Sequence, residues 1–282
     1  MRAERSTEVP AWLEAKLKKP GRAWRAFAEY LPPIALIFIL LLGWEVAVRV
    51  WEIPKWLLPS PWQIVVATFE GRDLLGPHIW QTLKESWLGL ALALASGLAL
   101  ATAIDLSGFL RRALYPLLVA SQTVPIMAIA PLLIIWFGYG ILPKVIVVAL
   151  VCFFPIAIST ADGLRAADPD LISLLRAIGA TRWQIFFKVR LPGAMPAFFS
   201  GLRIAITYSV IGAIIGEWVG AKEGLGIFMT RSSKSFLTDR VFSAIAITSL
   251  LSIAMFLAAL ALERALLGWY YTAAREERWE EI

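Results

Sequence analysis

The sequence predicts an all-α polytopic membrane protein with about six transmembrane helices and a helical hairpin on the cytoplasmic side. Hydrophobic residues make up 59% of its 282 residues and charged residues only 17%. Uncharged runs recur at lengths that suit a bilayer core roughly 30 Å thick, which a helix crosses with about 20 residues. Between these runs lies a polar segment, residues 168–192, that carries the start and stop signals of two short helices.

The first apolar segment, Leu31–Trp51, contains only two charges. These are Glu45 and Arg49, which lie one helical turn apart and are therefore placed to form an ion pair. Among the later segments, Arg203 is the only internal charge, and we expect backbone carbonyls or a partner on another helix to satisfy it. The later segments of suitable length are Ser86–Ile104, Val145–Ala161, Leu191–Gly216 and Val241–Leu262.

The uncharged run Ala113–Pro143 is too long for one crossing, because its 31 residues would form a helix of about 46 Å at 1.5 Å per residue. We predict one span plus an irregular turn buried in protein. Dividing the run into two spans would instead export the polar hairpin. Prolines and glycines are the expected cause of the interruption. They are Pro116, Pro125, Pro131, Gly138 and Gly140.

The distribution of positive charge sets the expected orientation. Of 27 Lys and Arg residues, 17 fall in the N-terminal arm, the second and fourth loops and the C-terminal tail; nine fall in the other loops, and Arg203 belongs to neither set. This asymmetry places both termini and the hairpin in the cytoplasm. We expect an N-terminal arm (1–30) along the membrane interface or simply as a basic flank, a single transmembrane domain (31–266) with its main loop at 162–192, and a cytoplasmic tail (267–282). A short helix, Trp62–Glu70, is expected in the first external loop.

The hairpin is predicted from local capping signals. Asp168 is a good N-cap for a first helix, and Gly179 is suited to the left-handed residue that ends it. Thr181 then caps a second helix and forms a capping box with Gln184. We expect residues 191–192 to close the segment, because proline interrupts helices.

Several classes of function are excluded by what the sequence lacks. One cysteine and one histidine allow neither a disulfide framework nor a His/Cys metal site within one chain. We expect Cys152 to be a packing residue and His78 an ordinary external-loop residue. The glycine-rich phosphate loop of common ATPases is missing, so any ATP hydrolysis must come from another subunit. Ionisable residues deep in the spans are nearly absent, which argues against a proton relay. The net charge of +6 suits anionic lipid and requires no nucleic acid.

The hairpin resembles the signature loop of the membrane subunits of bacterial ABC importers, because Gly179, Val189 and the Leu-Pro pair at 191–192 fall at that loop's spacings. The family's Glu-Ala-Ala is replaced here by the residues at 173–175, so no role of that Glu transfers. The amino-acid sequence of the loop is similar to that of the family branch that imports nitrate, sulfonates, taurine, riboflavin and the pyrimidine precursor of thiamine. Other segments similar to this branch are 58–61, 131–138, 201–203, 217–221 and 224–226.

The resemblance implies a non-catalytic permease subunit in the bacterial inner membrane, with ATP and Mg bound by a separate ATPase dimer and no cofactor in this chain. Closure of that dimer would be passed to the spans through the hairpin. Further implied partners are a second permease copy or a paralogue, an extracytoplasmic solute-binding protein and membrane lipid. Three aromatic residues, Trp183, Phe186 and Phe187, are expected to pack the hairpin against its own spans, and Arg182 is read equally well as a solvated charge. The expected ATPase-coupling residues are Arg176, Ala177, Gly179, Ala180, Thr181, Arg182, Leu191 and Pro192.

A translocation path is expected between two permease domains, lined by the proline-broken span and the span that follows the hairpin. For each candidate path residue, helix packing is the plain alternative and outweighs contact with the solute. Glu217 and Trp218 are expected to begin an external loop where the binding protein docks, although a solvated helix end and an interfacial anchor are their plain alternatives. The candidate path residues are Met127, Trp136, Tyr208 and Ser209.

The substrate is predicted from resemblance alone. Residues 216–221 read most like permeases for a thiamine pyrimidine precursor or riboflavin, which favours a flat aromatic heterocycle. An importer of alkanesulfonate, taurine or nitrate is the alternative within the family. Outside the family, the alternatives are an ion-coupled secondary transporter and a membrane scaffold.

Overall fold

The computed structural model describes residues 22–268 and 270, with side-chain surroundings from residue 31 onward. Residues 1–21 of the predicted arm and most of the predicted tail lie outside these residues, whereas residues 22–30 of the arm form the start of a helix. Throughout the described residues the regular structure is helical, without strands, which confirms the all-α class. The chain divides into two compact units between Trp62 and Gln63.

The first unit contains α2 (Arg22–Val50), whose part from Leu31 is an apolar span of 20 residues. The predicted ion pair is present near its end, where Arg49 Nε donates to Glu45 Oε1 at 2.6 Å. The other oxygen of Glu45 accepts the backbone N–H of Trp62 at 3.0 Å. The ion pair therefore also holds the chain that follows the span.

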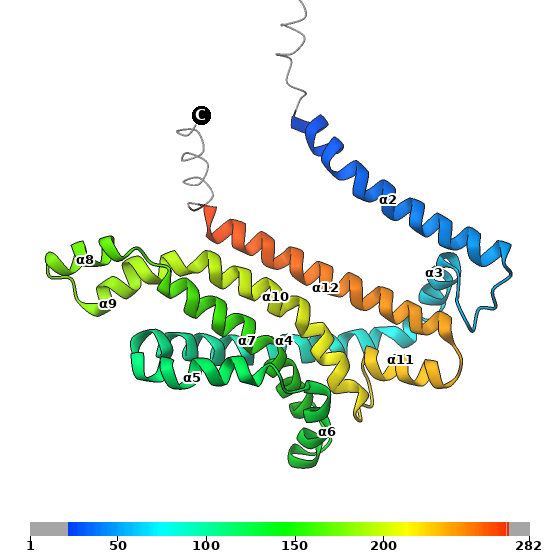
Figure 1. The fold of residues 1–282 in the computed structure, drawn as a ribbon. Helices are drawn as coiled ribbons and strands as arrows, with labels where there is room; N and C mark the ends of the chain where they lie inside the picture. The colour runs from blue at the N-terminus through cyan, green and yellow to red at the C-terminus, as the bar shows by residue number, and fades with distance from the viewer. Residues whose placement is uncertain (1–21, 269, 271–282) are drawn as a thin grey trace, which may run out of the picture. The chain divides into compact units, whose positions relative to one another are not determined.

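The second unit is built around α7, which packs most extensively against α10 and α4 (Figure 1). The single cysteine, Cys152, is fully buried in this core and donates its thiol to the carbonyl of Ala205, as expected of a packing residue. Gly89 on α4 lies so close to Val148 on α7 that a Cβ there would overlap it. Close approach at small residues is how helices associate in lipid. The long helices of this unit are α4 (Arg72–Leu106), α7 (Leu142–Arg165), α10 (Leu191–Trp218) and α12 (Thr238–Leu266).

The predicted break in the long apolar run is confirmed. The run forms α5 (Gly108–Ser121) and α6 (Ile126–Phe137), which meet at an angle of 101°. Pro125 stands immediately before α6, and a proline disfavours helical geometry in the residue that precedes it. The other two prolines, Pro116 and Pro131, lie inside α5 and α6 without ending them. Counting the bent pair as one span, the described residues contain up to six candidate spans.

Two short helices join the spans on one side, α3 (Pro61–Glu70) and α11 (Leu225–Lys234). The first agrees with the helix predicted over Trp62–Glu70. Thr68 on α3 donates to Ser243 on α12 at 2.9 Å. Leu225 begins α11 and is completely buried against Leu75 and Phe228.

The second helix of the hairpin does not end at residues 191–192, so that part of the prediction is wrong. Helix α9 (Arg182–Ile185) passes through a π-helical turn (Phe186–Arg190) into α10, giving 37 continuous residues. In this wider turn Leu191 N–H bonds to the carbonyl of Phe186, five residues earlier. The extra residue shifts the hydrogen-bond register just where Pro192 has no N–H to donate, so the helix continues through the proline.

Candidate functional site

The hairpin between α7 and α10 has the caps that its sequence predicts. It comprises α8 (Pro169–Ala177) and α9. The Asp168 carboxylate accepts the backbone N–H of Asp170 at 2.8 Å. At the second helix, Thr181 Oγ1 accepts the N–H of Gln184 and the Gln184 side chain accepts the N–H of Thr181. Both helix starts are therefore fixed by side chains within the hairpin.

The corner of the hairpin depends on Gly179, which has a φ of +83°. Its N–H bonds to the carbonyl of Arg176 at 3.0 Å, and the N–H of Ala180 bonds to the carbonyl of Leu175 at 2.9 Å. These two bonds form a complete Schellman motif, which requires a left-handed residue at this position. A Cβ on Gly179 would meet no atom within 4 Å, so the requirement is for backbone conformation and not for space.

Basic side chains surround a small cavity of 200 Å³ between the hairpin and the end of α4. Arg190 Nη1 donates to both carboxylate oxygens of Asp105, each at 2.8 Å, and Asp105 is almost fully buried. Arg176 and Arg182 line the same cavity, are exposed, and form no ion pair within the described part of the chain. The ion pair fastens the hairpin to α4, and the two exposed arginines leave positive charge available to a partner.

The aromatic residues of the hairpin divide into one anchor and two exposed rings. Phe186 is buried with Leu164 and Ala194, as predicted. Trp183 and Phe187 are 60% and 58% exposed and stack on each other with ring centroids 5.9 Å apart. Their predicted packing against the spans is therefore wrong, since the two rings pack on each other and remain largely exposed.

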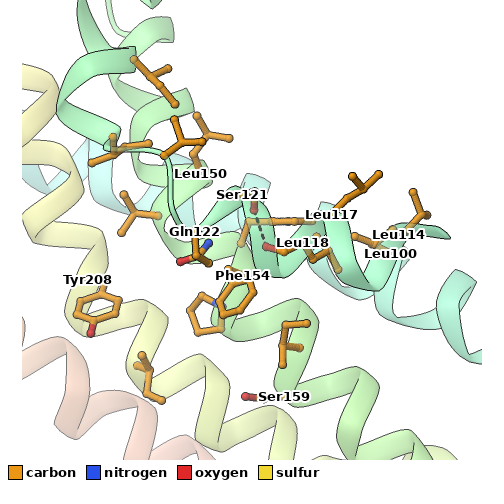
Figure 2. Close-up of a pocket in the computed structure, with 18 of the residues that line it drawn as sticks. Leu100, Leu114, Leu117, Leu118, Ser121, Gln122, Leu150, Phe154, Ser159 and Tyr208 are labelled. Carbon is orange, nitrogen blue, oxygen red and sulfur yellow. Dashed lines mark hydrogen bonds between the residues drawn. The ribbon is translucent and has the colours of Figure 1, made fainter. Parts of the chain in front are cut away.

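A cavity of 950 Å³ lies where the broken span meets α7 and α10 (Figure 2). Its wall is mainly aliphatic and aromatic, and no charged residue lines it. Four of the lining residues carry polar groups: Ser121, Gln122, Ser159 and Tyr208. Ser121 already donates to the carbonyl of Leu118 at 2.7 Å. Within the described part of the chain, the side chains of Gln122, Ser159 and Tyr208 form no hydrogen bond. Their polar groups therefore remain available to a bound solute.

The predicted path residues do not share one surface. Tyr208 lines the cavity. Ser209, the next residue on α10, is completely buried and donates to the carbonyl of Ile206. Met127 and Trp136 lie on α6 with 53% and 66% exposure, outside the cavity lining. Of the four, the structure therefore brings only Tyr208 to the cavity.

Glu217 and His78 lie inside the helical unit, not on an external loop as expected. Helix α10 continues through Trp218, so Glu217 is in a helix, fully buried, and accepts a hydrogen bond from Thr82 at 2.6 Å. His78 lies within α4 and its Nδ1 accepts the N–H of Gly224 at 2.9 Å. Only Trp218 of the predicted docking pair is exposed.

Residues 93–268 match the family of binding-protein-dependent transport system inner membrane components. The chain belongs to this family. It is thus a permease subunit of an ABC importer and lies in the membrane as a multi-pass protein.

Curated relatives of the permease extend the match beyond this region. The formylaminopyrimidine transport permease protein ThiX of Halalkalibacterium halodurans is 43% identical over 242 residues, covering 86% of this chain and 96% of ThiX. The riboflavin transport system permease protein RibX of Chloroflexus aurantiacus is 36% identical over 84% of this chain and 89% of RibX. The taurine transport system permease protein TauC of Escherichia coli is 31% identical over 88% and 92%.

The fold of the permease is also found among solved structures. An inward-facing conformation of the MetNI methionine ABC transporter superposes with a TM-score of 0.62 at 21% identity, covering 70% of this chain and 97% of that one. This likeness supports the helical architecture described above.

Sequence reasoning missed several buried ionisable residues of the permease, among them Glu85 and Lys144. Glu85 immediately precedes the uncharged run that begins at Ser86, and Lys144 immediately precedes the one that begins at Val145. The predicted spans therefore exclude both residues, although helices α4 and α7 begin before the uncharged runs do. Extending each helix upstream of its uncharged run and following which face each residue occupies would have identified them. Lys144 lies within the first turn of α7, and Glu85 lies well inside α4.

Proposed function

We propose that the permease transmits the work of a separate cytoplasmic ATPase through its hairpin and thereby moves a small solute across the inner membrane. The observation that carries this proposal is the hairpin itself: two capped helices joined by a Schellman corner at Gly179 and fastened to α4 through Arg190 and Asp105. Such a unit moves as one body, as force transmission requires. Arg176 and Arg182 offer positive charge to acidic side chains on the ATPase.

We infer that two permease domains, from two copies of this chain or from a copy and a paralogue, enclose the path. The 950 Å³ cavity is open and lined by the bent α5–α6 pair, α7 and α10. Broken helices at membrane depth are tolerated where they face protein or a water-filled cavity. A second domain over this surface would convert an open pocket into an enclosed path.

The solute that best suits the cavity is an uncharged, flat aromatic heterocycle such as a thiamine pyrimidine precursor or riboflavin. The apolar wall suits a ring system, and Gln122 and Tyr208, which both line the cavity (Figure 2), supply polar groups that can bond a heterocycle. The identity to ThiX and RibX supports the same substrate class.

A sulfonate, taurine or nitrate importer is the second candidate, supported by the identity to TauC. An anion bound in a low-dielectric site needs a cation or several donors to replace its hydration. No cation lines the cavity, and Arg203 is engaged by Glu263 at 3.3 Å. The observed charge distribution therefore favours the aromatic solute.

Uptake into proteoliposomes tests the substrate. The permease is reconstituted with the ATPase and the binding protein of its producing organism, and ATP-driven accumulation of labelled formylaminopyrimidine, riboflavin, taurine and nitrate is compared. We expect one of the two heterocycles to accumulate. Accumulation of taurine or nitrate alone would reverse the substrate assignment, and uptake that needs an ion gradient but no ATPase would overturn the proposed mechanism.

Cysteine labelling in intact cells tests the orientation. The only native cysteine, Cys152, is fully buried, so single exposed cysteines can be introduced without a reactive background. Ala177→Cys on the hairpin and Lys222→Cys in the α10–α11 loop form a matched pair of exposed positions. We expect a membrane-impermeant maleimide to label residue 222 only, and labelling of residue 177 from outside would contradict the proposed orientation.

A further inference from the structure

We propose that a buried polar network centred on Glu217 positions the α10–α11 loop, residues 219–224, so that a binding protein docked on this loop is mechanically connected to the spans. This inference rests on the proposed import function and adds positioning residues to it. The network joins four segments of the second unit: α4, the start of α7, the end of α10 and the start of α11.

The carboxylate of Glu217 is bonded on both sides. Oε1 accepts the hydroxyl of Thr82 at 2.6 Å, and Oε2 accepts the backbone N–H of Gly226 at 2.5 Å. Thr82 Oγ1 in turn accepts the N–H of Leu225 at 2.9 Å. One turn earlier on α4, His78 accepts the N–H of Gly224. Three consecutive backbone N–H groups of the loop and α11 are therefore held by side chains of α4 and α10.

A buried ion pair adjoins this set of bonds. Lys144 Nζ lies 3.1 Å from Glu85 Oε1, which also accepts a hydrogen bond from Gln81 at 2.6 Å. The Glu85 side chain is completely buried and that of Lys144 is 9% exposed. A Cβ on Gly216 would lie 3.1 Å from the Lys144 backbone, so the start of α7 and the end of α10 are in close contact beside the ion pair.

Glycine permits the loop to approach the carboxylate. Gly224 has a φ of +130°, and a Cβ there would overlap the carboxyl group of Glu217. The two residues before it, Lys222 and Glu223, are exposed. The loop thus presents an outer surface with charged side chains while its backbone is fastened inside the unit.

The network and the hairpin lie at opposite ends of the same two helices (Figure 1). Helix α7 begins at the network and ends before the hairpin, whereas α10 begins at the hairpin and ends at the network. These helices have the most extensive packing in the unit. A displacement at one end is therefore carried as a rigid-body movement to the other, over about 36–42 Å at 1.5 Å per residue for helices of 24 and 28 residues.

Stability alone is a poor account of the network. Replacing a buried ion pair by apolar residues of similar size is often neutral or stabilising. What the polar groups add is a fixed register between the loop backbone and the helices. A binding protein docked on the loop can move the spans only if the loop keeps this register with the helices.

The test measures ATP hydrolysis by the permease–ATPase complex in nanodiscs, without and with an excess of the purified binding protein carrying its endogenous ligand. The variants are Glu217→Gln and the double variant Glu85→Leu/Lys144→Met, which removes both charges of the ion pair. Glu70→Gln is the matched control, because it neutralises an exposed carboxylate of the same unit that belongs to neither the loop nor the network. Thermal melting and recovery of the intact complex report on folding.

We expect basal hydrolysis to stay within about twofold of the wild type in every variant. Stimulation by the binding protein should fall at least about fivefold in the two network variants, the lower end of typical coupling between sites, and remain unchanged in the control. Backbone amides 224–226 should also exchange hydrogen faster in Glu217→Gln. Full stimulation in a double variant that melts like the wild type would overturn the proposal.

If removing charges prevents the complex from assembling, an isosteric variant tests the proposal instead. Thr82→Val deletes the hydroxyl that joins Glu217 to Leu225 without changing any charge, and it too should lose stimulation. If it assembles and is fully stimulated, the network has no positioning role. A wild-type permease that binds no ATPase, or that shows no ATP-driven uptake, would refute the proposed function itself and is distinguished by the absence of any hydrolysis to stimulate.

Discussion

Replacing Gly179 provides the sharpest test of the hairpin's design. The residue has a φ of +83°, and a Cβ would meet nothing within 4 Å. Alanine therefore adds no steric contact, and its cost is the left-handed backbone alone, about 1–2 kcal/mol for an ordinary L-residue. A change of this size shifts the closed-to-open equilibrium of the corner by a factor of about 5–30. Asparagine tolerates the left-handed region better than alanine despite its larger side chain.

Amide hydrogen exchange in the purified permease measures this effect directly. The N–H groups of Gly179 and Ala180 close the Schellman motif, so in Gly179→Ala the amides of both residues should exchange about 5–30 times faster. Gly179→Asn should fall between alanine and the wild type. Gly193→Ala is the control, because Gly193 lies in α10 with nothing within 4 Å of its Cβ position and has no positive φ. Exchange that increases with side-chain size, with asparagine worse than alanine, would refute the conformational reasoning.

Three further substitutions test other parts of the permease. Thr181→Ala removes the capping box of α9 and should cost about 1 kcal/mol, seen as faster proteolysis within the hairpin; equal cleavage of variant and wild type would contradict the cap's role. Arg190→Ala leaves the buried Asp105 unpaired and should lower ATP-driven uptake and the melting temperature more than Arg190→Ala/Asp105→Ala does, whereas a more damaging double variant would argue against the ion pair. Gly89→Ala should destabilise the α4–α7 contact by about 1–3 kcal/mol through overlap with Val148. Adding Val148→Ala to this variant should recover part of the melting temperature. If the destabilisations of the two single variants simply add, the overlap is not the cause.

The hairpin shows how far local signals reach. Asp168, Gly179, Thr181 and Gln184 each act on backbone groups within five residues of themselves, so their roles could be predicted without knowing the fold. The prediction failed at Pro192, because a π-helical turn a few residues earlier shifts the hydrogen-bond register, and the helix continues although Pro192 has no N–H to donate. Such a turn depends on how the following helix packs, so capping residues in the sequence do not predict it.

The spans were predictable for a similar reason. Apolar runs of bilayer length and the interruption of Ala113–Pro143 follow from composition along one stretch of chain, and the structure has up to six candidate spans in its described residues. The cavity was only partly predictable. Tyr208 lines it, whereas Met127 and Trp136 do not, because helical phase along one segment does not say which neighbour covers each face.

The sequence by itself determined the helical membrane class, the family resemblance and the caps of the hairpin, since these depend on residues close together in the chain. Only the tertiary structure decided that Glu85, Lys144 and Glu217 are buried together. Lys144 is 59 residues from Glu85, and Glu217 is 135 residues from its partner Thr82. A charge can be buried only where another segment supplies its partner, and the packing of separate helices supplies that partner.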